Sequence, residues 1–353
     1  MQITGIESVE FGAPDMAEAR TVFSDWGLRK AAAGGAGSGF AALNGARVVV
    51  RPEQSRLLAP RVGKSNFREV IFGVRSKRDL TEIGEELSRD RSVSVAADGS
   101  LHTHDDADVN IGFRIWTPRA GVAERVTRFN QPGRRDRLDR IGTVYTQAQP
   151  FQMGHIVFFV PDTRAAENFY RKRLGWWVSD RYAGEVGVFL RWAAKSEHHN
   201  MFLLKSRSGS TELHHIAFEV NDVHEVFGGG MTYADKGHVT DTGPGRHPIS
   251  SAYFWYFKNP LGGSIEYFAD PDWVTEQGWK PHNYTVNRFS EWHLPDGLPE
   301  NDGTPGGSTG KPAGKPGGKP GGKPAGNTIR KALKATDKLE RPVPMPGKRK
   351  ARA

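Results

Sequence analysis

A chain of 353 residues, 37% of them hydrophobic and 10% aromatic, is long enough for two or three structural units with buried cores. The absence of cysteine excludes disulfide bonds, thiolate metal sites and cysteine nucleophiles. The net charge of +9 is unevenly distributed: residues 311–353 hold 13 of the 49 basic residues and two of the 40 acidic ones, which leaves 36 basic and 38 acidic residues elsewhere. Residues 1–310 are therefore nearly neutral, and their charge does not indicate a nucleic-acid-binding surface.

Neither end of the chain has the pattern of a membrane or export segment. No apolar run reaches the ~18 residues of a membrane-spanning helix, and residues 1–5 lead directly into a strand-like segment. We therefore expect no signal peptide and a cytoplasmic location. Residues 301–353 contain a Gly-Lys-Pro-Ala/Gly repeat, which can neither form a helix nor bury a core, so they are predicted to be a disordered basic tail. Such a tail suits contact with anionic surfaces, nucleic acid included, and equally a solubilising role.

The body contains an internal repeat. A strand pattern over residues 4–15 ends in Pro14-Asp15 and precedes a helix pattern, and the same order recurs around Pro161-Asp162. Residues 70–74 and the following helix pattern match the segment that begins at His215. Each unit continues into short strand-like runs. The economical prediction is an α+β fold of four tandem βαβββ units in two pairs.

This repeat predicts the domain organisation. The expected parts are an N-terminal pair of units over 1–120, a connector over 121–150, a C-terminal pair over 151–272, an aromatic-rich extension over 273–300 that covers a pocket mouth, and the tail over 301–353.

Three strands of the second pair each carry one candidate metal ligand: His155, His215 and Glu266. A single histidine on an apolar strand is more often a core residue than a ligand. Three candidates at equivalent points of repeated units make that interpretation much weaker. Two imidazoles and one carboxylate form a facial metal site, which leaves the opposite face of the ion open.

The first pair lacks such ligands. The equivalent positions hold Ser8 and fall near Glu69 and Arg114, a combination that does not form a metal site. The N-terminal half is therefore predicted to be structural or to form interfaces.

The second half resembles the type I extradiol ring-cleavage dioxygenases of the vicinal oxygen chelate (glyoxalase/bleomycin resistance) superfamily. The resemblance covers roughly residues 4–290 and is strong over 151–272. It rests on Met153-Gly154-His155, on His214-His215 and on Ile265-Glu266-Tyr267. Its most specific part is the spacing of His247, Tyr256 and Glu266, which reproduces the family pattern of a histidine, a tyrosine nine residues later and a glutamate ten further on.

The resemblance implies extradiol (meta) cleavage of a catecholic substrate with dioxygen, at an Fe(II) or Mn(II) ion held by His155, His215 and Glu266, in a homo-oligomer. It also implies a histidine that transfers protons. Alternation along the strand that begins near Asn200 should point one of His198 and His199 inward. The family pattern matches His198, which we favour, and His199 is the second choice. His247 and Tyr256 are expected to hydrogen-bond the bound substrate or oxygen.

Adjacent residues of a strand point to opposite faces, so His214 is expected to point away from the site. Two alternatives stay open. A glyoxalase-like lyase or isomerase would normally have a fourth protein ligand near residues 200–204, where no acidic residue or glutamine occurs. An aromatic-ligand-binding protein of the same fold would need neither a metal nor a proton-transferring histidine.

Overall fold

In the computed structural model, each of the four βαβββ units begins with a strand and a capped helix. The Pro-Asp pairs of the sequence repeat are the turns that start two of these helices. Asp15 Oδ1 accepts hydrogen bonds from the second and third backbone N–H groups of its helix at 2.7 and 3.1 Å, and Asp162 Oδ1 does so at 2.9 Å. Ser76 and Asp222 cap the other two. A cap of this kind contributes about 1 kcal/mol to helix stability.

The first sheet has eight strands in the order β2-β3-β4-β1-β5-β8-β7-β6. Strands β1 and β5 pair antiparallel at its centre, and each has the last strand of its own unit as a parallel neighbour. The two units are thus related by an approximate twofold axis. Their elements are β1 (Ile3–Ala13), α1 (Met16–Asp25), β2 (Arg29–Ala31), β3 (Ser38–Ala41), β4 (Arg47–Pro52), β5 (Phe67–Val74), α2 (Lys77–Leu87), β6 (Ser94–Val95), β7 (Leu101–His104) and β8 (Asn110–Ile115).

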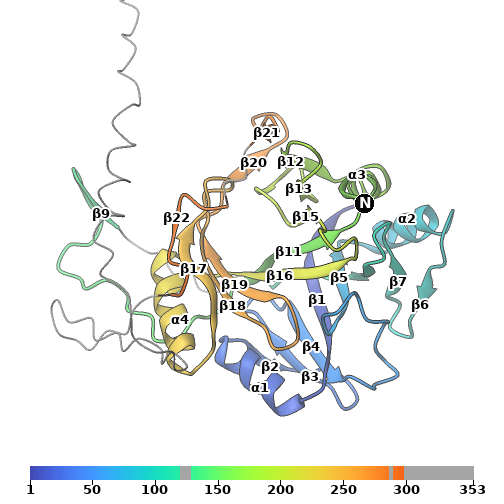
Figure 1. Ribbon diagram of the computed structural model, residues 1–353, viewed down its shortest axis with the longest axis horizontal. Helices are drawn as coiled ribbons and strands as arrows, with labels where there is room; N and C mark the ends of the chain where they lie inside the picture. Colours follow the sequence, from blue (N-terminus) through green and yellow to red (C-terminus); the bar gives the residue numbers. More distant parts are fainter. Residues whose placement is uncertain (120–128, 286–288, 298–353) are drawn as a thin grey trace, which may run out of the picture. The chain divides into compact units, whose positions relative to one another are not determined.

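The second sheet has ten strands in the order β21-β12-β13-β15-β11-β16-β19-β18-β17-β22, and its central eight repeat the arrangement of the first sheet (Figure 1). Its units contain β11 (Gln152–Val160), α3 (Thr163–Asn168), the π-helical turn η1 (Phe169–Arg173), β12 (Trp177–Tyr182), β13 (Gly187–Arg191), β14 (Lys195–Glu197), β15 (Met201–Lys205), β16 (Glu212–Glu219), α4 (Val223–Asp235), β17 (Thr240–Arg246), β18 (Tyr253–Lys258) and β19 (Ser264–Ala269).

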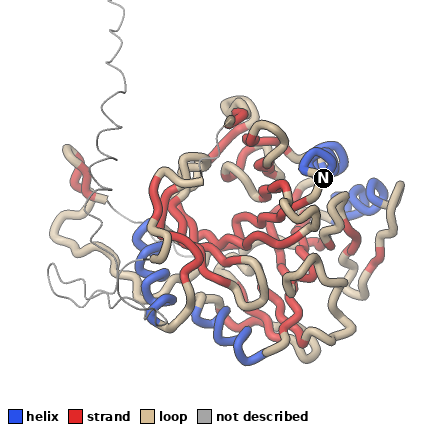
Figure 2. The backbone as a smooth tube through the Cα atoms, in the orientation of Figure 1, coloured by secondary structure: helices blue, strands red, loops and turns tan. Residues whose placement is uncertain are grey.

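Short strands complete the described chain. They are β9 (Asn130–Gln131) and β10 (Arg134–Arg135), which form a hairpin, and β20 (Trp273–Thr275), β21 (His282–Tyr284) and β22 (Trp292–His293). The helices lie on the outer side of the strands (Figure 2). The predicted fold class, an α+β arrangement of tandem βαβββ units in two pairs, is confirmed.

Trp26, which directly follows α1, packs the first sheet's units against the second sheet. Its fully buried indole stacks on Tyr267 of β19 with ring centroids 3.5 Å apart, and the Tyr267 hydroxyl donates to the Trp26 carbonyl at 2.8 Å. Because side chains alternate along a strand, the residue before Tyr267 points to the other face of the sheet. This packing therefore fixes the direction of Glu266.

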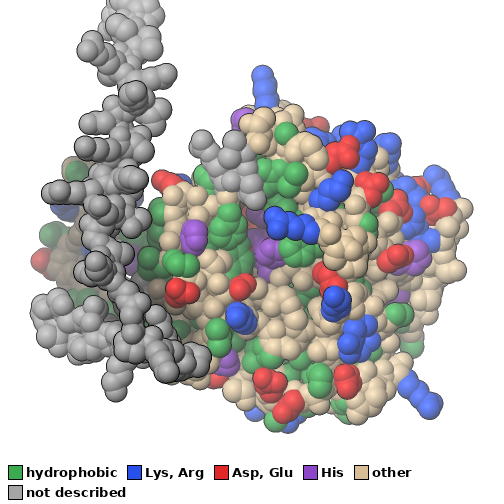
Figure 3. All heavy atoms as spheres, viewed as in Figure 1, with side chains coloured by type: hydrophobic (Ala, Val, Ile, Leu, Met, Phe, Trp, Pro, Cys, Tyr) green, Lys and Arg blue, Asp and Glu red, His purple; other side chains and the backbone are tan. Residues whose placement is uncertain are grey.

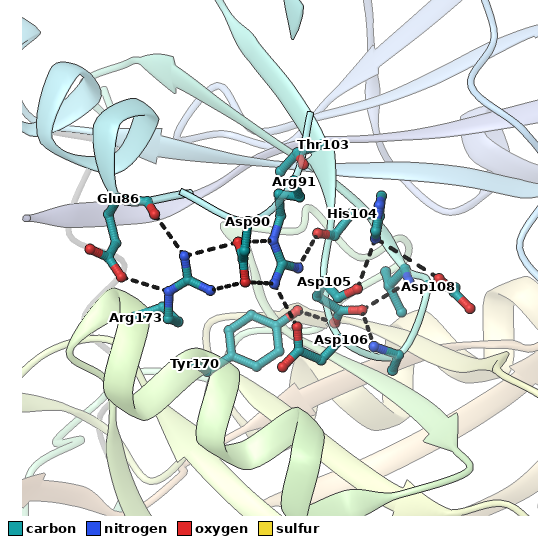
Figure 4. Close-up of polar contacts among 12 residues, drawn as sticks. Glu86, Asp90, Arg91, Thr103, His104, Asp105, Asp106, Asp108, Tyr170 and Arg173 are labelled. Atoms are coloured by element: carbon teal, nitrogen blue, oxygen red, sulfur yellow. Dashed lines mark hydrogen bonds and ion pairs between the residues drawn. The ribbon is translucent and has the colours of Figure 1, made fainter. Parts of the chain in front are cut away.

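Charged groups make a second link between the two halves (Figure 4). Arg173 donates through Nε to Glu86 at 2.6 Å and through Nη1 to Asp90 at 2.8 Å. Beside them, the Tyr170 hydroxyl donates to the buried carboxylate of Asp105 at 2.7 Å. These contacts join η1 to the unit that contains α2.

The structure describes residues 1–119, 129–285 and 289–297. The predicted disordered tail over 301–353 lies outside these residues, as do residues 121–128 of the predicted connector. None of the helices in the described ranges is both long and apolar enough to cross a membrane.

Candidate active site

A cavity of about 80 Å³ lies inside the curve of the second sheet. Its walls come from strands across almost the whole width of this sheet, so the sheet is bent into a half-barrel around it. Most of the wall is apolar, and polar side chains gather at one side, where the three candidate ligands lie. Histidine and hydrophobic side chains surround a hollow on the face shown in Figure 3. The apolar lining residues are Val157, Phe189, Phe202, Leu204, Ile249, Ala252 and Phe289.

The candidate ligands His155, His215 and Glu266 come together on this wall. Glu266 Oε2 lies 3.2 Å from His155 Nε2 and 3.1 Å from His215 Nε2, and the two nitrogens are 3.3 Å apart. Two donors at right angles, each about 2.1 Å from an ion, would be about 3 Å apart. The donor set and its spacing therefore fit one divalent ion with an open side. Among the described residues, this trio is the group found to be able to hold a metal.

Bulges in two neighbouring strands aim these ligands. The pairing of β11 with β16 shifts by one residue at Gly154 and again at His214, and such bulges redirect side chains. A Cβ on Gly154 would lie 2.3 Å from the ring of Phe268, so only glycine fits this position. The second bulge places His214 on the cavity wall. The expectation that His214 points away from the site was wrong, because strict alternation does not survive a bulge.

His214 also supports a ligand directly. Its Nδ1 atom lies 2.7 Å from His215 Nδ1. When His215 donates this hydrogen bond, its Nε2 atom keeps the lone pair that a metal needs, and such a partner fixes both the tautomer and the direction of the ring.

The surroundings of the candidate ligands favour the protonation states that bind a cation. Burial raises the pKa of Glu266, but the imidazoles of His155, His215 and His247 beside it outweigh burial and hold this pKa well below its usual range. Burial lowers the pKa of His215 to about 3. An ionised carboxylate and a neutral imidazole are the protonation states that bind metal.

His247 and Tyr256 form a polar edge beside the ligands. The Phe289 carbonyl can only accept, so His247 Nδ1–H donates to it, at 2.6 Å, and Nε2 is left as an acceptor 3.1 Å from the Tyr256 hydroxyl. Burial, followed by the charge of Glu266, raises the pKa of Tyr256 well above its ordinary value. Tyr256 therefore stays a hydrogen-bond donor.

The structure reverses the expected directions of His198 and His199. His199 lines the cavity, and its ring centroid lies 4.4 Å from that of His155. His198 is fully buried behind it, and its Nε2 lies 2.8 Å from Asp180 Oδ2. The alternation of β15 does not extend back to these residues, because the chain bends between β14 and β15. The expectation that His198 faces the cavity is therefore not met.

Asp180 was not singled out in the sequence. It is fully buried on β12, at a shift in the pairing of β12 with β13. Its Oδ1 accepts the backbone N–H of His282 at 2.6 Å. Nothing in the spacing of Asp180 and His198 predicts their contact, since it depends on how strands β12 and β14 are brought together.

The first sheet has no counterpart of the ligand set in its described residues. Ser8 and Glu69 occupy the positions equivalent to His155 and His215, and Glu69 pairs with His102 at 2.8 Å. The strand register places Gly112, and not Arg114, opposite Ile71 at the position equivalent to Glu266. The estimate from sequence was two residues off.

The segment after β19 adds one short strand to each edge of the second sheet. Strand β21 pairs with β12 at one edge of the sheet, and β22 pairs with β17 at the other. Phe289, which lies between these two strands in the sequence, lines the cavity.

The fold and site define the chain as having the vicinal oxygen chelate architecture. Residues 152–273 match the family model of the Glyoxalase/Bleomycin resistance protein/Dioxygenase superfamily. This part of the chain is thus a domain of that superfamily, in agreement with the resemblance seen in the sequence.

Curated proteins with similar sequences include two whose names refer to catechols or dioxygenases. Metapyrocatechase 2 from Cupriavidus necator is 37% identical over 138 residues, which cover 39% of this chain and 42% of that protein. The 3-methylcatechol 2,3-dioxygenase of Pseudomonas putida is 30% identical over 146 residues, 40% of this chain and 48% of that protein. The chain thus matches less than half the length of each.

Solved structures share the fold over most of the chain. The Mn(II)-bound glyoxalase from Novosphingobium aromaticivorans has a TM-score of 0.66 at 19% identity and covers 86% of this chain and 97% of its own. BphC, a halotolerant catechol dioxygenase, has a TM-score of 0.64 at 18% identity, with 84% and 95% covered. At these identities the likeness concerns the fold alone.

Proposed function

We propose that this protein catalyses the metal-dependent extradiol cleavage of a catecholic ring with incorporation of dioxygen. The observation that carries the proposal is the convergence of His155, His215 and Glu266 at the wall of a largely apolar cavity, with donor atoms 3.1 to 3.3 Å apart. The names of the two curated relatives support the same reaction class.

The ligand set suits Fe(II) or Mn(II), which have similar preferences for imidazole and carboxylate. When bound, such an ion supplies three open coordination positions, enough for two catechol oxygens and dioxygen. The single carboxylate leaves a charge of about +1 on a divalent ion, which a catecholate monoanion neutralises in a cavity where unpaired charge is costly.

His199 is the proposed proton-transfer residue, in place of His198. Its ring is next to that of His155, so it can reach a substrate hydroxyl beside the ligands. Burial lowers the pKa of His199 well below its ordinary value, so the ring is neutral and can accept a proton. It would take the proton of the second hydroxyl and return it as the ring opens.

Tyr256 and His247 are proposed to hold the substrate from the other side. Tyr256 keeps its proton and can donate a hydrogen bond to an oxygen that gains negative charge. His247 is held by the Phe289 carbonyl, so its Nε2 atom points toward Tyr256 and the cavity. Both residues are prearranged before substrate arrives.

The cavity wall favours a neutral, single-ring catechol. Within the described residues no lysine or arginine lines the cavity, so a substrate carboxylate would find no cationic partner. The volume of about 80 Å³ is limited by the stacked rings of Phe189 and Phe202, whose centroids are 3.9 Å apart. These two rings are proposed to limit the space for a second substrate ring.

We propose, as expected from the sequence, that the protein acts in the cytoplasm as a homo-oligomer. The basic tail is proposed to contact anionic surfaces without taking part in catalysis. The proposed chemistry in the cavity depends neither on the oligomeric state nor on the tail.

The test is anaerobic reconstitution with Fe(II) or Mn(II), followed by a panel of catechols and dioxygen. We expect about one metal per chain and yellow ring-opened products. His155→Ala, His215→Ala and Glu266→Ala should each lose tight metal binding, whereas His224→Ala, an exposed change on α4, should not.

Full metal occupancy in all three ligand variants would refute the site. Metal binding without cleavage of any catechol, but with turnover of a hemithioacetal, would favour the glyoxalase-like alternative.

A further inference from the structure

Asp180, His198 and His199 form a chain of hydrogen bonds that leads from the protein interior to the cavity. Asp180 Oδ2 lies 2.8 Å from His198 Nε2, and His198 Nδ1 lies 3.2 Å from His199 Nδ1. We propose that Asp180 and His198 are positioning residues that hold His199 in the tautomer with a bare Nε2 atom facing the substrate. This inference rests on the proposed function.

The direction of every hydrogen bond in the chain follows from Asp180. Its carboxylate can only accept, so His198 must donate through Nε2–H. A neutral His198 then has a bare Nδ1 atom, which accepts the hydrogen bond that His199 Nδ1–H donates. His199 Nε2 is consequently left without a proton, and it is the ring nitrogen that remains for a ligand in the cavity.

The surroundings of Asp180 make this direction difficult to reverse. Asp180 and His198 are both fully buried, so no bulk water can replace a lost partner. The backbone N–H of His282 donates to Asp180 Oδ1 at 2.6 Å and cannot become an acceptor. Buried Arg191 lies close enough to contribute a compensating charge, and it donates to the hydroxyl of the adjacent Ser179.

This arrangement matters because the tautomer decides which proton transfer His199 can perform. With Nε2 bare, the ring accepts the substrate hydroxyl proton at the atom nearest to it. With Nε2 protonated, the same ring at the same position could only donate. A buried carboxylate that holds a histidine in its productive tautomer is a known device in catalysis, and its replacement by asparagine in serine proteases lowers turnover by about 10⁴-fold while the geometry is retained.

The tautomers are directly observable in the metal-free protein. In ¹⁵N-histidine-labelled protein at about pH 8, well above the ordinary histidine pKa of about 6.5, long-range ¹H–¹⁵N spectra distinguish protonated from bare ring nitrogens. We expect His198 to be protonated at Nε2 and His199 at Nδ1, with signals assigned from the His198→Asn and His199→Asn variants. A His199 ring protonated at Nε2 would overturn the proposal.

Asp180→Asn tests whether the Asp180 carboxylate determines the tautomers of His198 and His199. The His282 N–H should hold the amide oxygen, so the amide NH₂ faces His198 and reverses both tautomers. Turnover of the metal-loaded enzyme should then fall by about 10²–10⁴-fold, with metal content and catechol binding unchanged. Asp235→Asn, the same change at an exposed position on α4, should alter neither spectrum nor rate.

Unchanged tautomers and a near-normal rate in Asp180→Asn would contradict the proposal. If this variant does not fold, the spectrum of the unmodified protein still decides the assignment. The expected tautomers in a protein that cleaves no catechol would count against the proposed function and leave the hydrogen-bond assignment intact.

Discussion

The Nδ1 atom of His214 lies 2.7 Å from the Nδ1 atom of His215, on the side of the ring opposite the candidate metal. Loss of such a supporting partner typically weakens metal binding 10- to 100-fold. His214→Leu should therefore bind Fe(II) or Mn(II) about 10- to 100-fold more weakly, as measured by competition with a chelator. His214→Asn keeps an acceptor that can reach His215 and should be less affected. Equal affinities in both variants would contradict this role.

Asp105, buried between the two halves, should make stability depend on pH. Burial raises its pKa to about 6, against hydrogen bonds from Tyr170 and two backbone N–H groups. A carboxyl with a raised pKa in the folded state stabilises the fold below its unfolded-state pKa, and this contribution is lost as pH rises through about 6.

Asp105→Asn cannot ionise, so its stability relative to the unmodified protein should improve between pH 4 and pH 8, by on the order of 2 kcal/mol. Urea unfolding at both pH values measures this difference. The exposed neighbour Asp106 provides the control, since Asp106→Asn should show little pH-dependent difference. A stability difference for Asp105→Asn that does not change with pH would show that Asp105 does not titrate in this range.

Phe202 should limit the size of the substrate. Its ring stacks on Phe189 at the cavity wall, and Phe202→Ala opens space for a second substrate ring. We expect kcat/KM for a bicyclic catechol, relative to a monocyclic one, to rise about tenfold or more. Phe129→Ala, which removes a partly exposed ring stacked on His224 outside the cavity, should leave the ratio unchanged. A ratio that falls in Phe202→Ala would mean that the second ring binds elsewhere.

Removal of residues 303–353 should leave the kinetics on a small catechol unchanged, because this Gly/Lys/Pro-rich sequence cannot form a core and contains none of the three candidate metal ligands. Retention on heparin should decrease, since the segment has 13 basic and two acidic residues, whereas the rest of the chain has a small excess of acidic residues. A loss of activity greater than tenfold, or about 1.4 kcal/mol of transition-state stabilisation, would show that the tail reaches the active site.

The sequence alone was sufficient for the repeat, the fold class and the choice of His155, His215 and Glu266 as the residues that come together. Each lies on a strand that its local apolar pattern predicts, and the strands recur in repeated units that begin in the same way. Apolar alternation and the Pro-Asp caps are local signals, and residues at equivalent points of paired units necessarily meet at the same place in the sheet.

Only the tertiary structure decided which neighbouring histidines face the cavity and what holds them. The bulge at His214 and the bend before β15 each shift, by one residue, the alternation of side chains between the two faces of the strand. Neither feature leaves a clear signal in the amino-acid pattern. The partner of His198 is Asp180, on a strand that the βαβββ topology brings beside it. The direction of a buried side chain depends on such long-range packing, whereas the presence of the strand that carries it depends on local sequence.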